Sequence, residues 1–212
     1  MKEKTREILK ALYIEFPELQ MISQEMEGAL NLLIKGYQYG NKLLVCGNGG
    51  SAADSEHIVG ELMKGFRLKR PLPETLRKEI ESQSTGENLA DHLEEPLPAI
   101  SLTAHTALST AFNNDVSAET VFAQQVLGYG KEGDILLGIS TSGNSSNVVN
   151  AVKVAKALRM KTIGLTGVQG GRLKELCDIT IMVPEEETYR VQELHLPVYH
   201  ALCAAVEYEN FG

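Results

Sequence analysis

Two segments of the chain carry side chains that can accept and donate protons. In "AADSEHIVGEL", His57 and Glu61 lie four residues apart, so a helix places them on one face. In "RVQELHLPVYHAL", Gln192 and His200 lie on neighbouring helix faces, because eight residues at about 100° each leave them about 80° apart. If both helices border one crevice, Glu61 and His200 form a carboxylate and an imidazole able to move protons.

The same two segments offer ligands of the kind that zinc binds in proteins. Two imidazoles, one carboxylate and one amide oxygen would form a shell of nitrogen and oxygen donors. The residues are His57, Glu61, Gln192 and His200. A histidine on a half-apolar helix more often has a structural role, so the spacing leaves proton transfer, metal binding and a structural role open.

A glycine-rich turn, "GNGGSA" at 47–52, precedes the first of these helices and follows an apolar strand. Taken alone, it fits the dinucleotide fingerprint G-x-G-x-x-G/A. That site also needs a second strand ending in Asp or Glu roughly 20 residues further on. The chain has "GFRLKRPLP" there, and the next expected strand ends at Thr103, so a dinucleotide is disfavoured.

A second turn of the same design occurs in "DILLGISTSGNSSNVV". Its hydroxyl side chains, more than helix capping needs, are Ser140, Thr141, Ser142, Ser145 and Ser146. Two such turns at the carboxyl ends of parallel strands can converge on one crevice, where helix N-termini supply free N–H groups and partial positive charge. This arrangement favours a phosphate monoester on a small polyol.

Short apolar strands alternate with helices along the chain, which is the pattern of an α/β protein. Parallel strands need crossover connections, so we expect a three-layer α/β/α sandwich with a mostly parallel, five-stranded sheet. The expected strands are 42–47, 98–102, 133–140, 161–167 and 178–184. The expected helices are two within 4–38, separated by Pro17, then 52–66, 74–82, 106–115, 118–130, 141–160, 170–177 and 188–209. With 212 residues, 43% of them hydrophobic, we expect a single domain, 1–212, with N-terminal helices in 1–40 beside the sheet.

Residues 67–98 form a polar excursion that contains four of the seven prolines and many charged side chains. It is expected to be partly helical around 74–82. A lid, an oligomer contact and a solvated loop all fit this composition.

Composition excludes several classes of function. The net charge is -8 and the longest basic cluster is "RLKR" at 67–70, so we expect no nucleic-acid partner. No apolar stretch approaches the roughly 20 residues that span a bilayer, and "MKEKTREILK" lacks a signal-peptide core, so we expect a cytoplasmic protein with no membrane partner. Cys46, Cys177 and Cys203 lack metal-site spacing and are expected to be small buried side chains.

These motifs together resemble the sugar isomerase (SIS) fold and, within it, the sedoheptulose-7-phosphate isomerases, also called phosphoheptose isomerases. The resemblance covers 20–212 apart from 67–98, which looks like an insertion. It is carried by "CGNGGSAADSEH" with Glu61, "NND" at 113–115, "GISTSGNS" at 138–145, "LTGVQGG" at 165–171, and "VQELH" followed by His200.

The resemblance implies a role for each matching residue. Contacts to the sugar are implied for Asn48, Gly49, Gly50, Ser51, Asn114, Asp115 and Gln192. Contacts to the phosphate are implied for Ser140, Thr141, Ser142 and Ser145. Glu61 and His200 match the catalytic carboxylate and imidazole. The zinc ligands seen in some members are matched by His57, Glu61, Gln192 and His200.

The implied activity is conversion of D-sedoheptulose 7-phosphate to D-glycero-D-manno-heptose 7-phosphate through an enediol, for the synthesis of nucleotide-activated heptose. The implied assembly is a homotetramer with its active sites near subunit interfaces. Two alternatives stay open: a non-catalytic phosphosugar-binding protein, either a sensor or a partner of the replication initiator, and an isomerase of another phosphosugar. The chain departs from the family at Gly65, where many members have a phosphate-binding arginine, although Lys64 is adjacent, and at Pro197, which is expected to kink the last helix.

Overall fold

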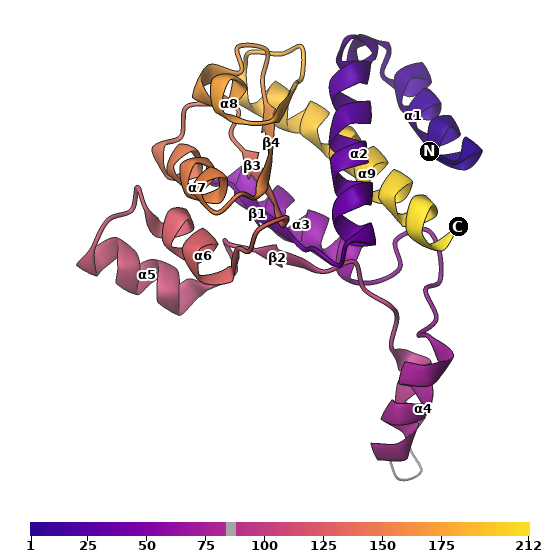
Figure 1. The fold of residues 1–212 in the computed structure, drawn as a ribbon. Helices are drawn as coiled ribbons and strands as arrows, with labels where there is room; N and C mark the ends of the chain where they lie inside the picture. Colours follow the sequence, from indigo (N-terminus) through magenta and orange to yellow (C-terminus); the bar gives the residue numbers. More distant parts are fainter. Residues whose placement is uncertain (84–87) are drawn as a thin grey trace.

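Five parallel strands form one sheet at the centre of the molecule (Figure 1). The computed structural model describes residues 1–83 and 88–212; residues 84–87 of the expected polar excursion lie outside the described residues. The strands are β1 (Leu43–Cys46), β2 (Ala99–Ser101), β3 (Ile135–Ile139), β4 (Lys161–Thr166) and β5 (Ile179–Met182). Their spatial order is β2-β1-β3-β4-β5. The expectation of a parallel five-stranded sheet is confirmed.

The helices agree with the expected pattern except at some boundaries. They are α1 (Glu3–Glu15), α2 (Ser23–Gln38), α3 (Gly50–Met63), α4 (Glu74–Gln83), α5 (Thr106–Asp115), α6 (Val121–Tyr129), α7 (Ser146–Ala157), α8 (Gly171–Leu176) and α9 (Thr188–Phe211), with short 3-10 helices at Pro17–Ile22 and Leu89–His92. Pro17 separates α1 from α2 as expected, because proline is tolerated in a first helical turn and disrupts a helix interior. The interval 52–66 was wrong at both ends, since α3 starts at Gly50 and stops at Met63. The last helix continues through Pro197.

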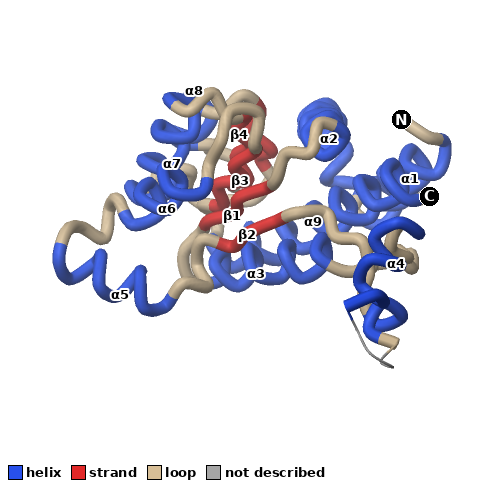
Figure 2. The backbone as a smooth tube through the Cα atoms, turned by 60° about the horizontal axis from the view of Figure 1, so that its bottom comes forward, coloured by secondary structure: helices blue, strands red, loops and turns tan. Residues whose placement is uncertain are grey.

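Helices cover both faces of the sheet (Figure 2). Along β1 the side chains alternate between two apolar cores, with Leu43 and Val45 in one and Leu44 and Cys46 in the other. The first core joins the sheet to α1, α2, α3 and α9, and the second joins it to α6, α7 and α8. The molecule is therefore the expected three-layer sandwich, and α1 forms an extra layer packed on α9.

The chain changes direction across the sheet between β1 and β3. From β1 it crosses to β2 on the face that α3 covers, and from β3 it crosses to β4 on the face that α7 covers. Helices α3 and α7 consequently start beside each other, at the carboxyl ends of adjacent strands. In parallel sheets of this order, such a switch point is where ligands bind.

The described residues of the excursion, 67–83 and 88–98, form a protruding arm with a fixed base (Figure 1). Helix α4 lies away from the sheet and has no buried residue. At the base, Pro71 and Glu94 form an antiparallel bridge, and the Glu95 N–H donates to the Arg70 carbonyl at 2.8 Å. The helix expected around 74–82 is confirmed, whereas the role of the arm stays a prediction.

Two other expectations concern the membrane and the cysteines. Within 1–83 and 88–212, no helix combines the length and the apolar character needed to cross a bilayer. All three cysteines are free thiols, with Cys46 and Cys203 buried and Cys177 half-buried.

His195 makes the stability of the fold depend on pH. Its ring is fully buried in α9, and burial lowers the pKa of His195 to about 4, although the backbone of Thr166 opposes this shift. An unfolded histidine titrates near 6.5, so the unfolded chain binds more protons below that pH. The contribution of His195 to the free energy of unfolding is therefore fully present above about pH 6.5 and is lost as the pH falls toward about 4. We expect His195→Leu to weaken the pH dependence of the free energy of unfolding between pH 4 and 7, by an amount that corresponds to nearly one bound proton. Urea unfolding at several pH values in this range measures it, and an unchanged slope of the free energy against pH would contradict the prediction.

Candidate functional site

The β1 turn, residues 47–50, brings backbone close to the start of α3. Gly49 has φ of 56°, in the left-handed region that favours glycine. A Cβ on Gly47 would lie 2.6 Å from the carbonyl oxygen of Ser51, so only glycine fits there. No side chain caps α3, which leaves its N-terminus open toward the crevice.

The β3 turn, residues 140–145, presents hydroxyl groups at the start of α7. The hydroxyls of Ser140 and Ser145 are 2.9 Å apart. Ser145 precedes α7 but makes no side-chain cap hydrogen bond, so its hydroxyl is not used by the helix. A Cβ on Gly143 would lie 2.0 Å from the carbonyl oxygen of Gly170, which explains the glycine. The turn thus combines hydroxyl donors with a helix N-terminus, as an anion site requires.

A reciprocal amide pair joins the two turns. Asn48 donates to the Asn147 side-chain oxygen at 2.9 Å, and Asn147 donates back to the Asn48 oxygen at 2.8 Å. The pair fixes the β1 turn to the first turn of α7. The sequence placed Asn48 at the site, but no motif or periodicity identified Asn147.

Gln192 reaches the β1 turn from α9. A Cβ on Gly50 would lie only 2.5 Å from Gln192 Nε2, so the amide rests against the glycine backbone. This places Gln192 with the residues expected to contact the sugar. It lies two helical turns before His200 on α9.

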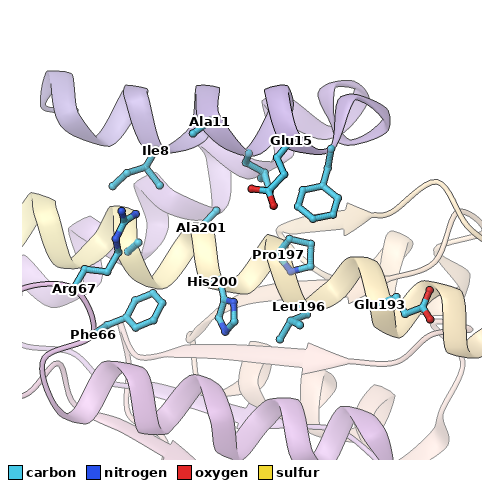
Figure 3. A pocket seen from close by; sticks show the side chains of 13 residues that line it. Ile8, Ala11, Glu15, Phe66, Arg67, Glu193, Leu196, Pro197, His200 and Ala201 are labelled. Atoms are coloured by element: carbon cyan, nitrogen blue, oxygen red, sulfur yellow. The ribbon is translucent and has the colours of Figure 1, made fainter.

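His57, Glu61 and His200 meet where α3 packs on α9. The Nε2 atom of His57 lies 3.2 Å from Glu61 Oε1 and 3.4 Å from His200 Nε2. The two imidazole rings are edge to face, with centroids 4.9 Å apart. Figure 3 shows His200 beside Phe66 on the side of α9 that faces α3. The sequence therefore identified a carboxylate and two imidazoles that the structure brings together.

Two residues that the sequence did not indicate hold the His57 ring. The Tyr199 hydroxyl lies 3.0 Å from His57 Nδ1 and donates to Asp54 Oδ1 at 3.3 Å. With Nδ1 held, Nε2 of His57 is directed toward Glu61 and His200. Burial raises the pKa of Asp54 above its ordinary value.

The surroundings of His200 favour its uncharged form. Burial is the main cause that lowers the pKa of His200, the neighbouring His57 lowers it further, and Glu61 opposes both. A neutral imidazole can accept a proton from a ligand.

The backbone around Gly65 leaves no room for the arginine that many family members have at this position. A Cβ there would lie 2.3 Å from the Leu68 carbonyl oxygen and 2.9 Å from Glu94 Oε1. Lys64 does not take the place of the arginine at the β3 turn in this structure, because its ammonium group lies 3.3 Å from Glu61 Oε2.

Some expected sugar contacts are not brought to the turns. Asn114 and Asp115 lie at the end of α5, where the Asn114 amide donates to Asp115 at 2.9 Å. A cavity of about 360 Å³ at the β1 turn is lined by Asn113 instead, together with Thr103 and Ser109. Ser51 is only 3% exposed beneath the turn, so its side chain is not open to a ligand here.

The donor set suits zinc in its chemistry, and one pair of its nitrogen atoms has a suitable separation. The 3.4 Å between the Nε2 atoms of His57 and His200 is close to the separation, about 3.3 Å, of two nitrogen ligands on one tetrahedral zinc. In the part of the chain that the structure describes, however, no three His, Cys, Asp or Glu side chains are arranged as a metal-binding group. Zinc binding therefore stays a prediction.

Sequence comparisons identify the relatives of this chain. The family model of the SIS domain matches residues 17–95 and 84–167. The phosphoheptose isomerase of Clostridium acetobutylicum is 42% identical over 89% of this chain and 84% of that protein. The phosphoheptose isomerase of Akkermansia muciniphila is 36% identical over the full length of both chains.

Solved structures give the same result. A phosphoheptose isomerase from Francisella tularensis is 30% identical with a TM-score of 0.73, covering 98% of this chain and 100% of that chain. A phosphoheptose isomerase from Neisseria gonorrhoeae is 33% identical with a TM-score of 0.69, covering 94% of this chain and 98% of that chain.

The contact between Gly50 and Gln192 generates a prediction about binding. Gly50→Ala should displace the flexible Gln192 amide and weaken the affinity for sedoheptulose 7-phosphate about tenfold, the equivalent of one hydrogen bond, in isothermal titration calorimetry. Gln192→Ala should weaken it equally, and the double variant no further. Gly60→Ala is the matched control in α3, because no atom lies within 4 Å of its Cβ; it should keep the affinity and raise the free energy of unfolding by roughly 0.5–1 kcal/mol. Additive losses in the double variant would contradict the prediction.

Proposed function

The chain belongs to the phosphoheptose isomerases of the SIS-domain family, and we propose that it interconverts D-sedoheptulose 7-phosphate and D-glycero-D-manno-heptose 7-phosphate. The observation that carries this proposal is the approach of Glu61 and His200 to the same atom, His57 Nε2, from separate helices. The chain is thus an isomerase with its own acid–base pair. Its product would supply the synthesis of nucleotide-activated heptose.

The reaction moves two protons through an enediol. A base removes the proton on C1 of the open-chain ketose and returns it to C2, while a second group transfers a proton between the oxygens on C2 and C1. The Glu61 carboxylate suits the carbon proton, and the neutral His200 imidazole suits the transfer between oxygens. The two groups approach from different helices, as the two sides of an open chain require.

The phosphate is the anchor of the substrate. The Ser140 and Ser145 hydroxyls and the uncapped N-terminus of α7 supply neutral donors and partial positive charge. Binding energy from this remote group can hold the reacting carbons in place. The net charge of -8 does not oppose this, because the donors are local.

We also propose that zinc binds the cluster, with its ligands drawn from His57, Glu61, Gln192 and His200. When bound, zinc would polarise the substrate carbonyl as a Lewis acid. The nitrogen and oxygen donors and the 3.4 Å separation of the two Nε2 atoms support this proposal. Zinc content measured by mass spectrometry in the wild-type protein and in His57→Ala tests it, and zinc absent from both would contradict it.

The homotetramer stays a proposal that two features support. A groove between α1 and α9 is lined mostly by apolar side chains and includes His200 (Figure 3). Its volume is about 550 Å³, and Leu196 in its lining is 41% exposed. Glu61 lies eleven residues after Gly50, which is about 16 Å along α3 from the β1 turn of the same chain. A second copy bound at this groove could bring its own β1 and β3 turns nearer to Glu61 and His200. Light scattering should give the mass of four chains, and a monomer at all concentrations would contradict the proposal.

We expect the reaction to take place in the cytoplasm, with neither nucleic acid nor membrane as a partner. The net charge of -8 supports the first absence. Cell fractionation tests the location.

A phosphosugar sensor or a partner of the replication initiator is not favoured. Neither role needs a carboxylate and an imidazole that contact one ring. In this chain, Glu61 and His200 both contact the ring of His57. Relative rates on a panel of phosphosugars distinguish a heptose isomerase from an isomerase of another sugar.

Glu61→Gln tests the role of the carboxylate. We expect kcat to fall by about 10²–10⁴-fold with little change in KM, because the amide keeps the shape but cannot accept the carbon proton. Product formation from sedoheptulose 7-phosphate is followed by NMR, with and without added zinc. Glu132→Gln, at the opposite end of the sheet beside Arg159, is a control that should keep wild-type kcat. No aldose from the wild-type protein under either condition would overturn the proposed function.

A further inference from the structure

Arg70 and Glu207 form a completely buried ion pair outside the proposed reaction. Both side chains are 0% exposed, and their nearest nitrogen and oxygen atoms are 2.8 Å apart. Charged side chains are rarely buried unless they are paired and hydrogen-bonded. No step of the isomerisation uses either residue.

Glu207 organises the segment that follows α3. Its Oε1 atom accepts hydrogen bonds from the backbone N–H of Phe66 and from Arg70 Nε, both at 2.8 Å. Its Oε2 atom accepts the backbone N–H groups of Arg67 at 2.7 Å and Leu68 at 3.1 Å. One carboxylate on α9 therefore holds three consecutive backbone amides.

Arg70 uses its remaining donors on the end of α3. Its Nη1 donates to the Leu62 carbonyl at 2.7 Å, and its Nη2 donates to the Glu61 carbonyl at 3.3 Å. Carbonyls in a last helical turn lack partners within the helix, and a cation there is favourable. Arg70 thus fixes α3 at the residue that bears the proposed catalytic carboxylate.

The same pair is tied to His200. Glu207 follows His200 by seven residues, so both lie on one face of α9, within about 20°. Phe66, whose N–H is held by Glu207, places its ring against His200 with centroids 5.6 Å apart (Figure 3). The ion pair therefore contacts the helix end that carries Glu61 and the residue that packs on His200.

We infer that Arg70 and Glu207 are positioning residues that set the separation of Glu61 and His200. This inference rests on the proposed function, because it assigns the pair a role in that reaction. Proton transfer requires closely defined distances, and a displacement of about 1 Å can cost about 100-fold in rate. A pair that served only to hold the base of the arm would affect stability and leave kcat unchanged.

The test compares Glu207→Gln with a matched control. We expect Glu207→Gln to lower kcat by about 10- to 100-fold and to change KM by less than about threefold. The control is Asp134→Asn at the amino end of the sheet. Asp134 is 3% exposed, accepts the backbone N–H groups of Lys42 at 3.0 Å and Lys131 at 2.9 Å, and pairs with the Lys42 ammonium. Asp134→Asn should therefore keep wild-type kcat in the folded protein.

A double variant covers the case in which Glu207→Gln leaves an unpaired buried cation and fails to fold. Arg70→Met with Glu207→Gln removes both charges, and such neutral replacements often fold well. We expect this double variant to keep a cooperative thermal transition and to show kcat at least tenfold below wild type. Wild-type kcat in either variant, or an equal loss in Asp134→Asn, would overturn the inference. No turnover by the wild-type protein would instead overturn the proposed function, and the positioning role with it.

Discussion

The packing of α3 against α9 is the contact on which the site depends. Each helix alone carries only part of the chemistry, and the carboxylate and imidazoles come together because both helices lie on the same face of the sheet. The order of the strands makes this possible, since α3 follows β1 and α9 follows β5, so two helices distant in sequence share one layer. The fold thus brings together side chains that are far apart in the sequence, as the 143 positions between His57 and His200 show.

The two ends of α3 carry different groups of the candidate site. At its N-terminus, the glycine turn and the amide pair of Asn48 and Asn147 form a rigid, uncharged lining beside the hydroxyls of the β3 turn. Toward its C-terminus lie the carboxylate and imidazoles that are proposed to transfer protons. Helix dipoles and hydroxyls can hold an anion without lysine or arginine, which would allow a chain of net charge -8 to bind a phosphate.

The parts of the site that could be predicted are those that follow from local pattern. The alternation of apolar strands with helices predicted the three layers of the fold. The repeated glycine- and hydroxyl-rich turns predicted which end of the sheet carries the candidate site. The roles of Tyr199, Asn147 and Glu207 could not be predicted, because each depends on a partner that only the tertiary fold brings near; Glu207 and Arg70 are 137 positions apart. The assignment of Asn114 to the sugar, which the family motif implied, stays a prediction, because in this chain Asn114 lies at the end of an exposed helix.

The base of the arm makes the position of the helices that carry the candidate site independent of the length of the arm. The bridge of Pro71 with Glu94 and the hydrogen bond from the Glu95 N–H to the Arg70 carbonyl join the outgoing and returning segments at the base of the arm, so a change in the length of the arm adds or removes residues beyond this base. The entropic cost of lengthening such a loop grows only slowly. A segment inserted between Pro71 and Glu94 would therefore extend the arm beyond its fixed base and leave the contact between α3 and α9 unchanged.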